Sequence, residues 1–268
     1  MNRFLPASLA FAAGALAAAA QAQQGNQLVL PLSDPSRPAV LEVNLFSGDV
    51  AITAHDRSEV VIVTSDEDVD EIEREVRGGL RRIPNTSIGL TAEERDNRVS
   101  ISVDWSNRDV DLSIAVPRMT SVHASTMNDD LVVRGVVGDH ELSSQNGDIA
   151  AFDVGGSAVV STMNGDVEVS FAEVDRTKPM SFRSFNGDFE ITFPADFSGD
   201  LVIAAGRGDV LTDFDVELQP QAAIIERGGD PQRRQIRMER EVRARVGAGG
   251  PEIRFKTYNG NIVIRRGQ

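Results

Sequence analysis

The sequence contains no cysteine among its 268 residues. An exported protein of this composition would be held together by packing and backbone pairing, without disulfide bonds. The absence also excludes thiol catalysis and zinc or iron–sulfur sites that need cysteine ligands.

Residues that commonly build catalytic or metal sites are also scarce. His55, His123 and His140 have no metal-binding spacing, and we expect them at the surface or at strand edges. One tryptophan, Trp105, and one tyrosine, Tyr258, are available for stacking on sugars. No Gly-x-Ser-x-Gly motif supplies a hydrolase nucleophile. The sequence therefore predicts no cofactor, no metal ligand set and no catalytic residue.

Long apolar runs are absent except at the N-terminus. Arg3 precedes an apolar, alanine-rich run from Leu9 to Ala20, which ends in Ala20-Gln21-Ala22. This order is typical of a secretory signal peptide cleaved after Ala22. An uncleaved anchor is the alternative, but the run is short for a bilayer span. We expect residues 1–22 to be removed, leaving 23–268 as one domain without a membrane span, in the periplasm or outside the cell.

Acidic residues outnumber basic ones, which gives a formal net charge of −14. A chain of this charge repels nucleic acids and anionic lipid surfaces. We therefore expect no nucleic-acid partner.

What the chain does contain is a dense series of strand signals. Apolar and polar residues alternate in 41–45, 99–103 and 112–116, a pattern typical of strands with one face on a core. One segment departs from this period. Val69, Ile72, Val76 and Leu80 fit a short amphipathic helix over 66–80.

An internal repeat dominates the middle of the chain. Its pattern is Ser/Thr-x-x-Asn-Gly-Asp followed by an apolar strand residue, with copies at 125–131, 143–149, 161–167 and 184–189. Segments 206–210 and 46–50 resemble it, and 257–262 is expected to close the series. Asparagine and glycine tolerate positive φ, so each copy predicts strand, sharp corner and strand.

Two architectures accommodate this unit. In a β-solenoid each repeat is one coil and alike corners stack, whereas in an antiparallel meander each Asn-Gly is a hairpin tip. The steps of 18–22 residues, with the same context each time, favour the solenoid. We predict an all-β, right-handed β-solenoid of roughly 18–22-residue coils.

The stacked corners give the first candidate surface. In a solenoid Asp130, Asp148, Asp166, Asp188 and Asp209 would form a column. Such a column could recruit Ca²⁺, which prefers several oxygen ligands. The alternative, which we favour, is that each aspartate caps its own turn.

An insertion over 217–250 gives the second candidate. We expect its residues near 221–250 to leave the stack as a β-excursion with a basic outer face. Its candidate partner-binding residues are Arg233, Arg234, Arg237, Arg240 and Arg243. They could contact an anionic envelope polymer, an acidic protein surface or a second copy of the chain.

The repeat, the segment Val110 to Pro117 that leads into it and the segment Gly249 to Ile264 together resemble the bacterial putative-adhesin family of β-strand-repeat proteins. The resemblance covers most of residues 40–266. It implies a right-handed β-solenoid in an exported or envelope protein, with unknown function and no catalytic residues.

The sequence thus favours a non-catalytic envelope scaffold or adhesin-like module that binds an envelope polymer or protein. A carbohydrate-active enzyme on a β-helix is the second hypothesis, because β-helical folds can carry paired carboxylates. A column of equivalent aspartates, however, lacks the two different environments that acid and base need. A purely structural or self-associating module is the third.

Overall fold

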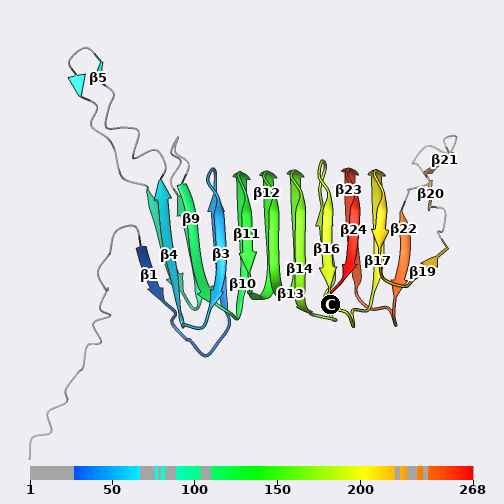
Figure 1. Ribbon diagram of the computed structural model, residues 1–268, viewed down its shortest axis with the longest axis horizontal. Helices are drawn as coiled ribbons and strands as arrows, with labels where there is room; N and C mark the ends of the chain where they lie inside the picture. Colours follow the sequence, from blue (N-terminus) through cyan, green and yellow to red (C-terminus); the bar gives the residue numbers. More distant parts are fainter. Residues whose placement is uncertain are drawn as a thin grey trace, which may run out of the picture.

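Period-2 alternation produces strands throughout the computed structural model, which describes residues 27–66, 76–77, 80–81, 89–103, 110–220, 224–227, 234–237 and 241–267. The described residues contain no helix, so none that could span a membrane. The all-β prediction is confirmed. Hydrogen bonds join 20 strands into one mixed sheet, and Figure 1 shows them side by side along the long axis of the molecule.

Strand pairing divides this sheet into two series that face each other across the core. In order of pairing, the first series is β7 (Leu90–Arg95), β8 (Arg98–Val103), β2 (Ala39–Leu45), β10 (Thr120–Asn128), β12 (Val137–Asn146), β13 (Ile149–Asn164), β15 (Met180–Arg183), β23 (Glu252–Asn259), β17 (Gly199–Arg207), β22 (Val242–Val246) and β19 (Val216–Gln219).

The second series shares β13, whose 16 residues pass from one series to the other. In order of pairing it is β1 (Gln27–Pro31), β4 (Glu59–Asp66), β9 (Val110–Pro117), β3 (Val50–His55), β11 (Leu131–Arg134), β13, β14 (Val167–Val174), β16 (Phe189–Phe193), β24 (Ile262–Arg266) and β18 (Val210–Thr212).

Pairing is parallel in the middle of both series; it is antiparallel at both ends of the first series and at the β1 end of the second, which closes at β18 with a parallel pair. Equivalent positions of successive repeats are direct partners, as in Ser125↔Ser143 and Ser143↔Ser161. The antiparallel strands β1, β4, β7, β22 and β19 lie at the two ends. Repeats therefore lie beside one another in register, and each inward position faces the same position of its neighbours.

Inward residues form continuous apolar columns between the two series. Aliphatic side chains such as Leu41, Ile52 and Ile114 fill the N-terminal half. Phenylalanines fill the C-terminal half, where the Phe182 and Phe255 rings stack 5.1 Å apart. Because neighbours in a column carry similar side chains, each repeat buries its apolar residues against those of the next.

The corner glycines are required by the close approach of neighbouring repeats. A Cβ on Gly165 would lie 2.1 Å from the Gly147 carbonyl oxygen, and a Cβ on Gly187 would lie 1.9 Å from that of Gly165. Asp129 occupies the equivalent position one repeat before Gly147, with φ of 77°. The corner asparagines do not have positive φ, so the sequence argument for asparagine in these corners was wrong.

The order of strands in space differs from their order in sequence near the C-terminus. Strands β23 and β24 lie between the strands of 180–193 and those of 199–212. Segment 257–262 therefore does not close the stack, and the prediction that it does was wrong.

Two other predictions need correction. The helix expected over 66–80 is wrong where the structure describes it, because Asp66 ends β4, and β5 (Val76–Arg77) pairs with β6 (Leu80–Arg81). Residues 67–75 and 78–79 lie outside the described residues.

The β-excursion predicted over 221–250 is shorter than expected. Strand β20 (Ile224–Arg227) pairs with β21 (Arg234–Arg237), but β22 belongs to the main sheet, between β17 and β19.

The close contact between the corners of neighbouring repeats can be tested by substitution. We expect Gly165→Ala to destabilise the protein by more than about 2 kcal/mol, because its methyl group overlaps backbone that cannot move without breaking the register. Gly135→Ala is the control, since it adds left-handed strain of about 1–2 kcal/mol while its methyl group makes only an ordinary contact, 3.5 Å from the Ala54 Cβ. Urea denaturation measures both, and equal losses would contradict the overlap argument.

Candidate functional site

The predicted aspartate column exists for most of its length. One carboxylate oxygen of each member accepts the backbone N–H of the next, with Asp148 N to Asp130 Oδ1 at 2.8 Å and Asp166 N to Asp148 Oδ1 at 2.7 Å. Asp188 continues the series on Asp166 at 2.8 Å. Asp209 is not next, because Asn261 lies between them. Asp49 and Asp111 extend the column at the other end.

These contacts decide what the aspartates do. Each caps the corner of its neighbour, not its own turn as the sequence argument supposed. Asn261 takes the same place in the column with an uncharged side chain: its Oδ1 accepts the backbone N–H of Asp209, and its own N–H donates to Asp188. Capping the neighbouring corner therefore needs an oxygen acceptor but not a negative charge. Among the described residues no group of three acidic or histidine side chains is placed to hold a metal ion.

A ladder of asparagine side chains runs beside the column. The amide of Asn164 donates to Asn146 Oδ1 at 2.8 Å, and Asn186 donates to Asn164 Oδ1 at 2.8 Å. Asn128 and Asn259 form its ends, at 3.2 and 2.7 Å. Each inner asparagine both donates and accepts, which explains why the repeat carries asparagine at this position.

The structure describes the backbone of three of the five predicted basic residues of the excursion. Arg234 and Arg237 lie in β21, whereas Arg233 and Arg240 are outside the described residues. Arg243 lies in β22, with Nη2 3.8 Å from Glu241 Oε2.

The histidines also form no site. His140 is buried, which corrects the surface prediction for this residue, and its Nε2 contacts the Gly155 carbonyl oxygen at 3.1 Å. Burial lowers the pKa of His140. His123 lies near Glu141, and the His55 ring accepts a backbone N–H from Arg57.

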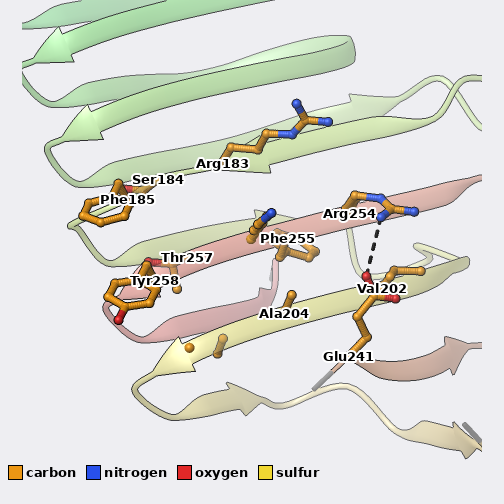
Figure 2. A pocket seen from close by; sticks show the side chains of 13 residues that line it. Arg183, Ser184, Phe185, Val202, Ala204, Glu241, Arg254, Phe255, Thr257 and Tyr258 are labelled. Carbon is orange, nitrogen blue, oxygen red and sulfur yellow. Dashed lines mark ion pairs between the residues drawn. The ribbon is translucent and has the colours of Figure 1, made fainter. Parts of the chain in front are cut away.

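A groove on the outer face of the first strand series is the strongest candidate site. Figure 2 shows it crossing β15, β23 and β17. Its volume is about 880 Å³. Its residues on β17 are small: Val202, Ala204, Ala205 and Gly206. The neighbouring strand carries longer side chains, including Arg254, Lys256 and Tyr258. The groove exists because short and long outward side chains lie on adjacent strands.

Two cations line this groove without compensation. Arg183 and Lys256 are direct cross-strand partners, both exposed, and neither has an ion pair among the described residues. Neighbouring strands lie about 4.8 Å apart, and like charges opposite each other are destabilising. By contrast Arg254 contacts Glu252 at 2.6 Å and Glu241 at 3.7 Å, the latter pair marked in Figure 2. An anion could bind between Arg183 and Lys256.

Aromatic side chains border the groove at the corner. The rings of Phe185 and Tyr258 stack with centroids 5.0 Å apart and an angle of 8° between their planes. Arg207, from the strand beyond, places its guanidinium 5.9 Å from the Tyr258 ring centre. Three of the four ring faces are therefore used within the protein: both faces of Tyr258 and one face of Phe185. Both side chains are about half exposed, at 53% and 49%.

Two shallower hollows continue the groove along the stack. The nearest, of about 330 Å³, shares Phe185 with it and is lined by Ser143 and Ser161. The next, of about 450 Å³, shares Ser143 and includes Ser125. These three serine hydroxyls have no hydrogen-bond partner in the described part of the chain. The result is a track along the long axis that is basic at one end and lined over the rest by serine hydroxyls together with apolar side chains such as Met127 and Met163.

Sequence analysis missed this site because strands distant in sequence build it. One signal was available: the residue before the corner asparagine is large and apolar in four of the five copies, at Met127, Met163, Phe185 and Tyr258, and polar only at Gln145. These side chains point outward, so packing in the core does not explain why they are apolar.

The asparagine ladder gives a graded test of corner stability. Asn164→Ala removes one donated and one accepted bond, whereas Asn128→Ala removes a single accepted bond. We expect Asn164→Ala to cost about 1–2 kcal/mol and Asn128→Ala roughly half as much, in urea unfolding. Equal losses of stability in the two variants would show that the contributions of the ladder hydrogen bonds are not additive.

The aspartate column gives a second test. Asp166→Asn keeps an acceptor for the Asp188 N–H and removes like-charge repulsion, so we expect stability within about 0.5 kcal/mol of the original or above it. Asp166→Ala should cost about 1 kcal/mol or more. Thermal unfolding with and without Ca²⁺ completes the comparison. Equal losses for both variants, or a rise in melting temperature with Ca²⁺ that Asp166→Asn abolishes, would show that the charge is needed.

Comparison with solved structures finds proteins to which this chain has a weak similarity. No family model and no curated protein matches the sequence. A putative cell adhesion protein from Clostridium sporogenes is 12% identical over 90% of this chain and 99% of its own, with a TM-score of 0.41. A putative adhesin from Bacteroides fragilis is also 12% identical, over 90% of this chain and 95% of its own, with a TM-score of 0.41. At this similarity neither structure assigns this chain a family or a ligand.

Proposed function

We propose that this protein is an exported, non-catalytic scaffold of the cell envelope, adhesin-like in that it binds an envelope partner through the groove at Arg183 and Lys256. The observation that carries the proposal is this uncompensated cation pair, on an outward groove of a protein with a net charge of −14. Uncompensated like charges in register lower stability, so binding of an anionic group accounts for their placement.

The fold belongs to the same proposal: a right-handed β-solenoid of 18–22-residue coils. In-register parallel partners 18 residues apart, such as Ser143 and Ser161, support it. Crossover connections between parallel strands are almost always right-handed. The signal-like segment 1–22 supports export to the periplasm or beyond.

The groove favours binding over glycoside hydrolysis. Such hydrolysis generally needs two carboxyl groups flanking the reacting bond. Glu241 is the single carboxylate among the residues lining the groove, and Arg254 and Arg243 both contact it.

Sedimentation with bacterial envelope fragments tests the proposed binding. The exported chain should sediment with the fragments, and Arg183→Gln/Lys256→Gln should remain in the supernatant. The matched control is Arg118→Gln/Arg134→Gln, which removes the same charge away from the groove. Failure of the original chain to bind, or equal binding by both double variants, would overturn this function.

A further inference from the structure

We propose that the groove and the serine-lined hollows beside it bind a linear acidic polysaccharide, with one sugar carboxylate between Arg183 and Lys256 and the neighbouring sugars along Ser161, Ser143 and Ser125. This deepens the proposed function and rests on it. It assigns the ligand class and the direction in which the ligand lies.

The charged end of the track fits a carboxylate. A guanidinium presents a planar fork of donors that matches a carboxylate, and the lysine ammonium adds a compact charge beside it. No other carboxylate competes for these two cations among the described residues, because Glu241 is held by Arg254 and Arg243.

The rest of the track fits uncharged sugar hydroxyls. Ser125, Ser143 and Ser161 are direct neighbours on successive strands, so their hydroxyls recur about every 4.8 Å along the axis. A serine hydroxyl both donates and accepts, which matches the hydroxyl groups of a sugar chain. The three hollows share lining residues, so one extended ligand can follow them without interruption.

The same features disfavour a nucleic acid. Single-stranded nucleic acids are bound by stacking bases on exposed aromatic faces. Here Phe185 and Tyr258 stack on each other and Arg207 covers Tyr258, so three of the four ring faces are already used within the protein.

Calorimetry with three defined polymers tests the proposal. The acidic sugar is a hyaluronan oligosaccharide long enough to span the three hollows. Its carboxyl-reduced form is the neutral sugar, and polyglutamate is the charged polymer without sugar. We expect hyaluronan to bind more tightly than either of the others.

Variants separate the two parts of the track. Arg183→Gln/Lys256→Gln should weaken hyaluronan binding about tenfold or more, while its melting temperature stays equal or rises because repulsion is removed. Ser125→Val/Ser161→Val should weaken hyaluronan but leave polyglutamate unchanged. The control Arg118→Gln/Arg134→Gln should bind hyaluronan as the original chain does.

Several outcomes would overturn the proposal. Equal affinity for hyaluronan and polyglutamate would show a site for charge alone. Absence of hyaluronan binding, while envelope fragments still bind, would reject the polysaccharide and leave the proposed function standing. Loss of fragment binding after protease treatment of the fragments would identify a protein partner instead. If the original chain binds no fragments at all, the proposed function fails as well.

Discussion

The close stacking of one repeat corner on the next determines much of this structure. At the corners backbone groups of adjacent repeats bond directly, as in Gly165 N to the Asn186 carbonyl at 3.0 Å. The glycine carbonyls come so near that a methyl group would overlap them. Once the corners are in register, the flanking strands follow, because the side-chain period of two fixes which residues face the core. The apolar columns and the two side-chain ladders are consequences of that register.

The acidic corners show how this stack tolerates charge. Each aspartate in the column between Asp49 and Asp188 has a like-charged neighbour, yet each gains a backbone N–H as a hydrogen-bond donor. A bond to an ionised acceptor contributes more than a neutral one, and exposure to water screens the repulsion. The column is therefore explained by capping between repeats, and it requires no bound cation.

Sequence reasoning predicted the strands, the corners and the adjacency of Asp130, Asp148 and Asp166, because these depend on local pattern and repeat spacing. It misjudged asparagine, since ladder bonding between repeats has no signature within one repeat. It also placed Asp209 beside Asp188, because periodicity does not reveal that the C-terminal strands β23 and β24 lie between them. The helix prediction at 66–80 followed an apolar spacing that strand pairing at Val76 and Leu80 overrides.

That same departure from sequence order creates the groove. If repeats lay in chain order, the small residues of β17 would adjoin β15, and Arg183 would have Ala204 as its neighbour. Placing β23 between them sets Lys256 beside Arg183 and Tyr258 beside Phe185, and leaves Ala204 and Gly206 as the floor on the far side. The cation pair, the aromatic border and the hollow thus all arise from one topological step. We infer that this inserted strand is what distinguishes the groove from the otherwise repetitive surface.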